Sequence, residues 1–149
     1  MNYQKLSKKA HTAKKHSYSP YSKFRVGSAL LTTSGKIFTG CNIENSSYSL
    51  TICAERAAFF KAISEGYRKF KAIAIASDGN FVSPCGACRQ VMFDFAPDLD
   101  VIITNSKGRT QILKMNLLLP EPFTFTNGSY WKIRTLWGGG RFRTCKKKE

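Results

Sequence analysis

The chain has 149 residues, of which 42% are hydrophobic and 13% aromatic, as is typical of a single globular domain with a sizeable core. No apolar run approaches the roughly 18 residues that a membrane span needs, so we expect no membrane partner. The first 16 residues are basic, but no apolar stretch follows them as it would in a secretory signal. We therefore expect a reducing, cytoplasmic compartment, in which the five cysteines are thiols or metal ligands rather than disulfides.

The formal net charge of +15 is concentrated at the two ends of the sequence. Residues 1–16 contribute five lysines and no acid, and residues 128–149 contribute seven basic residues and one acid. Residues 17–127 carry twelve basic and eight acidic side chains. A charge run at a terminus is most often a solvated tail, and we favour that interpretation. RNA or another polyanion stays the alternative partner, because clustered lysine and arginine attract phosphates.

The first half of the chain predicts two helices separated by a hairpin and a loop. A weak apolar stripe with a lysine-rich surface marks the first helix, which also carries both histidines, and we expect these to face solvent. Pro20 cannot continue a helix, and Gly66 is suited to end one. The expected elements are a helix over 2–16, strands over 26–33 and 36–40, a polar loop over 41–50 and a helix over 53–66.

The second half continues the alternation of helices and strands. The run at 70–77, rich in isoleucine and alanine, predicts a buried strand, and the next helix is expected to end before Pro97. The expected elements are a strand over 70–77, a helix over 83–95, strands over 99–106 and 109–115, and a helical turn within 116–123. This order predicts a layered α/β domain with a mixed sheet. We expect one domain over 1–127, followed by a basic, partly disordered extension over 128–149.

Two segments place cysteines and a glutamate in a pattern typical of metal chemistry. Cys53-Ala-Glu55 opens one predicted helix, and Cys85-Gly-Ala-Cys88 opens the next. A strand lies between them, so both helices should begin at the same edge of the sheet, where α/β folds usually place their sites. A helix N-terminus favours ionised thiols, and three thiolates suit a zinc ion whose fourth position is open to water. Glu55 would then be placed to take a proton from that water.

Two other interpretations of these cysteines are weaker. A structural zinc site would need a fourth protein ligand. The other cysteine and histidine side chains of the sequence belong to Cys41, Cys145, His11 and His16. Cys41 is more simply a small core residue. A redox dithiol at Cys85 and Cys88 would leave the Cys53-Ala-Glu55 segment unexplained.

These motifs resemble those of the small, homotetrameric, zinc-dependent cytidine deaminases. Zinc deaminases share such a cysteine set, with a glutamate that is not a ligand. The matching segments, in chain order, are "PYSKFRVGSALLT", "GCNIENSSYSLTICAERAAFFKAISEG", "SPCGACRQVMFDF" and "LLLPEPF". The resemblance covers roughly residues 18–123. It implies a cytidine deaminase-like fold of three α/β/α layers with a five-stranded mixed sheet, and a homotetramer with shared active sites.

The resemblance also implies roles for matching positions. Cys53, Cys85 and Cys88 would hold zinc, and Glu55 would be the general acid and base. The implied substrate contacts are Phe24 against the nucleoside, Asn42 and Glu44 on the ribose hydroxyls, the backbone of Ala54 on the pyrimidine, and Phe123, which matches an aromatic lent to a neighbouring subunit's site. Tyr21 and Tyr48 match tyrosines at or near subunit contacts.

The charge of the proposed metal site suggests two further residues. Zinc with three thiolates has a net charge of −1, which opposes ionisation of a bound water. A side chain that hydrogen-bonds the ligand sulfurs would withdraw part of that charge, and Arg56 and Gln90 are our candidates. A surface ion pair is the plainer alternative for Arg56.

The implied activity is hydrolytic deamination of cytidine and deoxycytidine to uridine and deoxyuridine with release of ammonia, by zinc-bound hydroxide and a glutamate proton shuttle, as in pyrimidine salvage. The alternative is an RNA-binding or polynucleotide-editing cytosine deaminase that uses its basic termini. The segment "NIEN" favours the nucleoside, because an amide and a carboxylate on ribose hydroxyls suit a small enclosed substrate. Trp131 and Trp137, which lie among basic residues, favour the polynucleotide.

Overall fold

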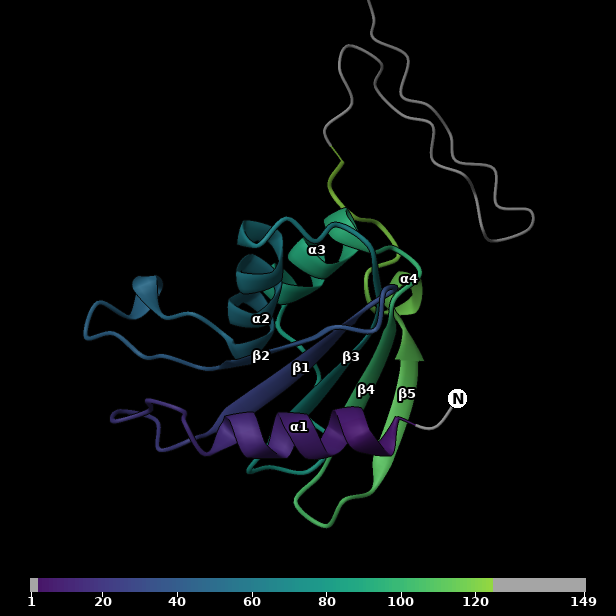
Figure 1. Ribbon diagram of the computed structural model, residues 1–149. Coiled ribbons are helices and arrows are strands. Elements are labelled where there is room, and N and C mark those ends of the chain that lie inside the picture. The colour runs from purple at the N-terminus through teal and green to yellow at the C-terminus, as the bar shows by residue number, and fades with distance from the viewer. Residues whose placement is uncertain (1–2, 125–149) are drawn as a thin grey trace, which may run out of the picture.

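The computed structural model describes residues 3–124, which form one mixed sheet between two layers of helices (Figure 1). The strands are β1 (Val26–Thr32), β2 (Ile37–Cys41), β3 (Phe70–Ser77), β4 (Asp100–Thr104) and β5 (Thr110–Lys114). The helices are α1 (Gln4–Lys14), α2 (Ala54–Ser64), α3 (Gly86–Phe95) and α4 (Met115–Leu118), with a 3₁₀ turn at Tyr48–Leu50. The strand order is β2-β1-β3-β4-β5, and β3 and β4 are parallel while the other neighbours are antiparallel. The predicted three-layer fold is therefore confirmed.

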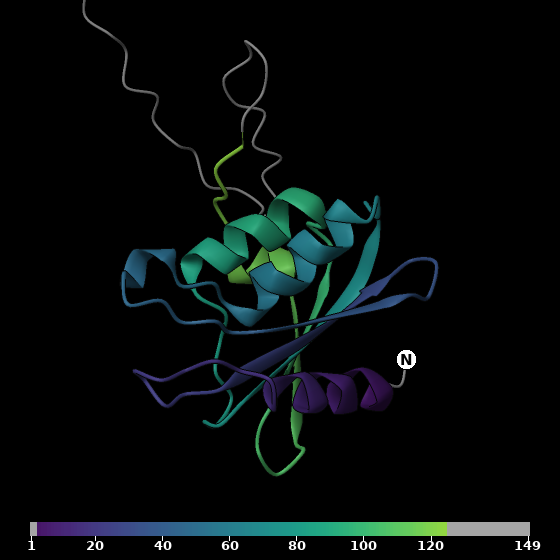
Figure 2. The same ribbon diagram turned by 60° about the vertical axis from the view of Figure 1, so that its left-hand side comes forward.

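The alternation of alanine and isoleucine along β3 explains why helices cover both faces of the sheet. Ala72, Ala74 and Ala76 belong to the core shared with α1, whereas Ile73 and Ile75 belong to the larger core under α2 and α3. Successive side chains of a strand point to opposite faces, so the small residues let α1 approach the sheet closely. Figure 2 shows α1 on one face of the sheet and α2 and α3 on the other.

Helix α1 lies so close to the sheet that the neighbouring strand needs a glycine. A Cβ atom at Gly27 would be 2.2 Å from the backbone nitrogen of Lys14 and 2.3 Å from the carbonyl oxygen of Ala10. The same close packing corrects one expectation about the histidines. His16 is exposed, but His11 is half-buried and its Nε2 lies 3.2 Å from Oγ1 of Thr104.

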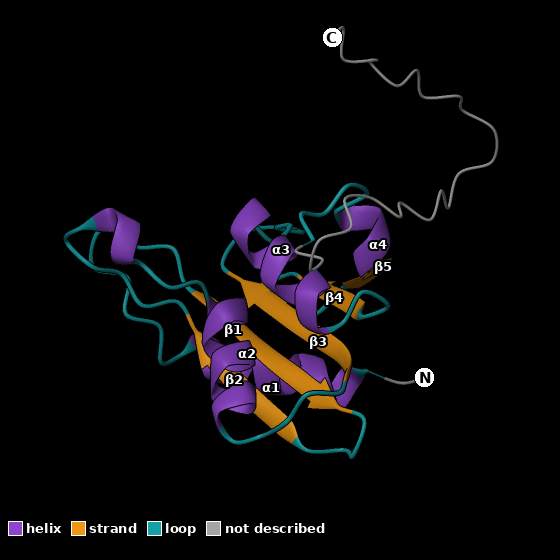
Figure 3. Ribbon diagram, turned by 90° about the horizontal axis from the view of Figure 1, so that it is seen from above, coloured by secondary structure: helices purple, strands orange, loops and turns teal. Residues whose placement is uncertain are grey.

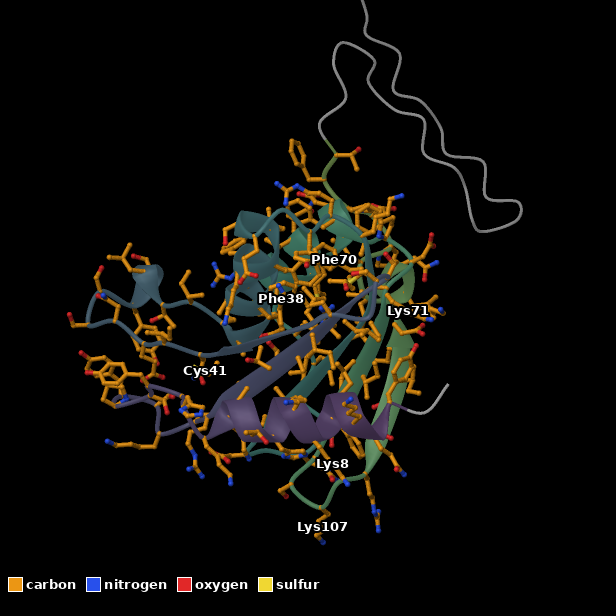
Figure 4. All side chains as sticks on the ribbon, viewed as in Figure 1. Lys8, Phe38, Cys41, Phe70, Lys71 and Lys107 are labelled. Carbon is orange, nitrogen blue, oxygen red and sulfur yellow. The ribbon has the colours of Figure 1, made fainter. Side chains whose placement is uncertain are left out.

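The thicker layer contains the aromatic core beneath α2 and α3. Phe59 is fully buried, and its ring contacts that of Phe70 edge to face, with 4.9 Å between the centroids. Phe38 and Phe70 lie between the sheet and these helices (Figure 4). Viewed from above, α2 and α3 both cross this face of the sheet (Figure 3).

The predicted stop of α2 is confirmed by its hydrogen bonds. Gly66 has φ of +89°, its amide donates to the carbonyl of Ile63 at 3.0 Å, and that of Tyr67 donates to the carbonyl of Ala62 at 3.0 Å. This pair of bonds forms a Schellman motif, which satisfies two carbonyl groups at the helix end. No helix within residues 3–124 is long and apolar enough to cross a bilayer. The expected extension over 128–149 lies outside the described residues, so the domain boundary stays a prediction.

Candidate metal and catalytic site

Two residues of the β1–β2 hairpin hold the N-terminus of α2 against the sheet. The buried Ser28 hydroxyl donates to the carbonyl of Ala54 at 2.7 Å. A Cβ atom at Gly40 would lie 2.4 Å from that same carbonyl oxygen and 2.6 Å from the amide nitrogen of Ala58. Helix α2 therefore begins directly on β2. The function of these two residues was not predicted from the sequence, although a glycine within a strand is a known signal of close backbone approach.

Three cysteines converge where α2 and α3 begin. Cys53 and Cys85 are the residues that immediately precede the two helices, and Cys88 lies in the first turn of α3. Their three Sγ atoms lie within 4.8 Å of one another, and those of Cys53 and Cys85 are 3.9 Å apart. A tetrahedral zinc ion with Zn–S bonds of about 2.3 Å places its sulfurs about 3.8 Å apart. The donor atoms and their spacing therefore fit zinc.

The cluster contains no fourth ligand from the described part of the chain. Its members range from the fully buried Cys88 to the exposed Cys85, so it reaches from the core to the surface. Cys41 lies elsewhere, with its thiol donating to the carbonyl of His16 at 3.2 Å. Cys145 is outside the described residues. Three ligands and one exposed side leave room for a small molecule at a fourth position.

The surroundings of Cys53 favour its thiolate form. The Cys88 thiol donates a hydrogen bond to Cys53, and the nearby Arg56 guanidinium adds a second interaction, so that the pKa of Cys53 is lowered to about 5. Nη2 of Arg56 lies 3.7 Å from that Sγ and 3.1 Å from the carbonyl oxygen of Thr51. Arg56 thus contacts a cluster sulfur, and it is in no ion pair among residues 3–124.

Glu55 is a buried carboxyl group beside this cluster. Its residue is 5% exposed, and burial raises the pKa of Glu55 to about 7, with the negative charge of Cys53 acting in the same direction. A carboxyl whose pKa lies near neutrality is suited both to accept and to donate a proton. The site thus combines a soft cation site with an acid–base group.

The backbone connects the predicted ribose-binding residues to the cluster. Ile43 and Ile52 exchange two backbone hydrogen bonds, of 2.9 and 3.0 Å, and Ile52 immediately precedes Cys53. Side chains alternate along an extended segment, so Asn42 and Glu44 share one face, opposite to the half-exposed Ile43. These two polar residues are both largely buried.

Asn42 and Glu44 also organise the loop that carries Phe24. The Asn42 amide donates to the carbonyl of Phe24 at 2.9 Å and accepts from the amide of Val26 at 2.8 Å. One Glu44 carboxylate oxygen accepts from the amides of Tyr21 and Ser22, at 2.9 and 3.2 Å, and the Ser22 hydroxyl donates to the other. The Ser22 hydroxyl and these amides lower the pKa of Glu44. Glu44 therefore carries its charge at neutral pH.

Gln90 and Phe123 form a third group, joined by hydrogen bonds. The Gln90 side chain hydrogen-bonds the backbone of Phe123 and the Asp94 carboxylate. Within residues 3–124 it makes no hydrogen bond to a cysteine of the cluster. The ring of Phe123 is exposed, with 72% of the residue accessible. These partners of Gln90 are not indicated by its local sequence.

Comparisons with known proteins agree with this site. The family model described as "Cytidine and deoxycytidylate deaminase zinc-binding region" matches residues 1–104. The chain is 50% identical over 132 residues to a cytidine deaminase of Sporosarcina psychrophila, with 87% of this chain and 97% of the relative covered. It is 49% identical over 129 residues to a probable cytidine deaminase of Dictyostelium discoideum, with coverage of 83% and 87%.

The fold agrees as well. A solved structure of cytidine deaminase from Burkholderia pseudomallei superposes with a TM-score of 0.80 at 46% identity, covering 83% of this chain and 100% of that chain. The family match spans the three-cysteine cluster, Glu55 and the helices that carry them. The chain therefore belongs to the cytidine and deoxycytidylate deaminase family.

Proposed function

We propose that this chain catalyses the hydrolytic deamination of cytidine and deoxycytidine to uridine and deoxyuridine. The observation that supports this most strongly is the convergence of three thiols and one buried carboxyl at the N-termini of α2 and α3. The relatives that are about half identical to this chain are cytidine deaminases, which supports the choice of substrate. Such a free-nucleoside deaminase fits pyrimidine salvage.

Cys53, Cys85 and Cys88 hold the zinc ion in this proposal. When bound, zinc supplies Lewis acidity, which activates a water molecule as a nucleophile at neutral pH. Glu55 takes a proton from that water and gives it to N3 of cytosine, which makes C4 electrophilic. The deprotonated water oxygen bonds to C4, and Glu55 carries the second proton of that water to the amino group. The C4–N bond then breaks, so water and cytidine become uridine and ammonia. Arg56 withdraws negative charge from the Cys53 sulfur.

The loop network around Glu44 binds the sugar. Asn42 and Glu44 hydrogen-bond the ribose hydroxyls, and the ring of Phe24 packs against the nucleoside. The backbone at Ala54 holds the pyrimidine beside Glu55, and the Ser28 hydrogen bond keeps that peptide in place. The isolated backbone bridge between Ile43 and Ile52 connects this loop to the segment that leads into Cys53.

We also propose a homotetramer, because an apolar patch lies exposed on two loops that project from the body of the chain. The members of this loop patch are Tyr18, Tyr21, Ile43, Tyr48 and Leu50, each at least half exposed. The rings of Tyr21 and Tyr48 contact each other, with 6.4 Å between centroids. Monomers rarely leave such a patch uncovered. The exposed Phe123 is a second group suited to reach a neighbouring subunit's site.

The proposal is tested by measuring zinc per chain together with ammonia release from cytidine, deoxycytidine and a cytosine-containing oligonucleotide. We expect about one zinc per chain, turnover of both nucleosides and none of the oligonucleotide. A metal-free purified protein that has no activity, and gains none on addition of zinc, would refute the assignment.

The same assay separates the nucleoside deaminase from the polynucleotide alternative. A chain shortened by residues 128–149 loses seven of the basic side chains, so its binding to RNA should weaken if the termini hold phosphates. We expect cytidine turnover to be the same with and without this segment. Deamination of the oligonucleotide in preference to cytidine, lost on truncation, would favour the alternative.

A further inference from the structure

The side-chain amide of Gln90 binds both backbone groups of Phe123. Its Oε1 accepts from the amide nitrogen of Phe123 at 3.0 Å, and its Nε2 donates to the carbonyl oxygen of Phe123 at 2.7 Å. Nε2 also donates to the carboxylate of Asp94 at 2.7 Å. A carboxylate accepts but cannot donate, so Asp94, one turn further along α3, fixes which way the amide faces. Both hydrogens of the amide nitrogen are then used.

The preceding residue anchors the same segment. Nη1 of Arg89 donates to the carbonyl of Leu118 at 3.0 Å, and its Nε donates to the carbonyl of Pro84 at 2.8 Å. Pro84 directly precedes Cys85, so one guanidinium joins the cysteine loop to the end of α4. Arg89 and Gln90 together fasten the segment from 118 to 123 onto α3, the helix that begins directly after Cys85 and carries Cys88.

Phe123 has no regular secondary structure to hold it. Residues 119–124 belong to no helix or strand. The Gln90 amide therefore makes the two backbone hydrogen bonds with Phe123 that a neighbouring strand would otherwise make. The ring itself is 72% exposed. The backbone of Phe123 is thus held in place while its ring is directed away from the body. Such an arrangement presents a side chain to something outside the described chain.

We propose that Gln90 is a positioning residue that holds Phe123 ready to close a nucleoside site. This inference rests on the proposed function, in which Phe123 of one subunit packs against the nucleoside bound by its neighbour. Gln90 acts through the backbone of Phe123, and within residues 3–124 it hydrogen-bonds no cysteine of the cluster. Without the amide, Phe123 must be ordered when substrate binds, which weakens binding. The loss should therefore fall on KM more than on kcat.

The test is a double-mutant cycle with Gln90→Ala and Phe123→Ala. We expect Gln90→Ala to raise KM for cytidine about tenfold, with kcat and zinc per chain close to those of the original protein. In the Phe123→Ala background the same change should have no further effect on KM, because no ring is left to position. Gln111→Ala, an exposed glutamine on β5, is the matched control and should change neither constant.

Hydrogen exchange at the Phe123 amide provides a readout that does not depend on activity. Gln90→Ala removes the acceptor of that N–H, so its exchange should become faster, while exchange in β3 stays unchanged. Gln90→Glu keeps an acceptor but replaces the donor with a carboxylate oxygen that faces both Asp94 and the Phe123 carbonyl, so exchange at the Phe123 amide should become faster in this variant too. If the original protein does not deaminate cytidine, the proposed function fails, whatever the exchange shows. Loss of zinc in Gln90→Ala, or equal effects in both backgrounds, would overturn the positioning role alone.

Discussion

Glu55 combines two properties that the proposed chemistry needs in one side chain. It is buried beside three thiols, and burial raises its pKa to about 7. Its position in the first turn of α2, two residues after Cys53, follows from the sequence alone. Its burial does not, because it depends on how α2 packs against the sheet and α3.

We predict that Glu55→Gln retains zinc but loses nearly all deamination. The amide has the shape of the carboxyl group but cannot carry a proton, and a positioned acid–base group typically contributes about 10²–10⁴-fold. Metal analysis and ammonia release measure the two properties separately. Glu65→Gln is the matched control, since that glutamate lies at the other end of α2, exposed and paired with Lys36. Near-normal turnover by Glu55→Gln would contradict the proton-shuttle role.

Helix α2 is positioned by backbone contacts with the hairpin rather than by large side chains. Gly40 faces the first two turns of the helix without a side chain, and Ser28 hydrogen-bonds the carbonyl of Ala54. Because Cys53 and Glu55 lie at this end of the helix, a shift of α2 moves both the metal cluster and the acid–base group.

We therefore expect Gly40→Ala to damage stability and the metal site together. The added methyl carbon would meet two backbone atoms, at 2.4 and 2.6 Å, so the helix must move, at a cost of about 3 kcal/mol. Urea unfolding and zinc per chain measure the two effects. Gly86→Ala is the control, because nothing lies within 4 Å of the added carbon, and its stability should be unchanged or slightly higher. Equal unfolding midpoints for the two variants would show that α2 can give way without strain.

Asp78, just after β3, ties α1 and the residue before β1 to the sheet. It pairs with Lys14 at 2.8 Å and Arg25 at 2.9 Å. The hydrogen bonds from Arg25, reinforced by Lys14, lower the pKa of Asp78 to about 2, from an ordinary 3.8. A lowered native pKa stabilises the fold above the ordinary pKa, and this contribution is lost as the pH falls towards 2.

The corresponding prediction is that Asp78→Asn lowers the free energy of unfolding at pH 7 by about 1 kcal/mol, since partly exposed ion pairs are screened by solvent. The free energies of unfolding of the variant and of the original protein should converge between pH 4 and pH 2, where Asp78 of the original protein loses its charge. Urea unfolding across this range measures the difference. Asp98→Asn, at an exposed position, is the control, and its free energy of unfolding should follow that of the original protein across this pH range. If the free energy of unfolding of Asp78→Asn also followed that of the original protein, the ion pairs with Lys14 and Arg25 would contribute no stability.

At the scale of the whole molecule, the loop patch lies far from the compact core. Figure 1 shows the loops before β1 and after β2 projecting together from one end of the sheet. Figure 4 shows Lys8 and Lys107 on the opposite side of the molecule from α2 and α3. The proposed subunit contact therefore uses the loop patch, and the loop after β2 that carries part of this patch also contains Asn42 and Glu44.

We predict that Leu50→Asp dissociates the proposed homotetramer. Leu50 is 63% exposed, and a charge buried without a partner at an interface is strongly unfavourable. Light scattering coupled to size exclusion would report the mass of the assembly, and cytidine turnover should fall with it while the zinc content stays. Ile112→Asp, at a 53% exposed position on β5, should leave the assembly intact. An unchanged mass for Leu50→Asp would place the subunit contact elsewhere.

The sequence by itself determined the order of elements and the layered α/β class with a mixed sheet, and it indicated the cysteines and the glutamate of the candidate site; the three layers were implied by the family resemblance. Alternating alanine and isoleucine in β3 and Gly66 after α2 are local signals that need no partner to be interpreted. The Cys53-Ala-Glu55 and Cys85-Gly-Ala-Cys88 segments are local too, and their placement at two helix starts predicts that the sulfurs meet.

Only the tertiary structure decided which residues support that site. Gln90 was expected to hydrogen-bond a ligand sulfur, and its partners in the described residues include Phe123, 33 residues further along the chain. Ser28 on β1 reaches Ala54 at the start of α2. His11 was expected in solvent but lies against Thr104. A polar side chain can satisfy its hydrogen bonds with many partners, and nothing in its local sequence selects one. The packing of distant segments makes that choice, because it brings a particular backbone group within reach.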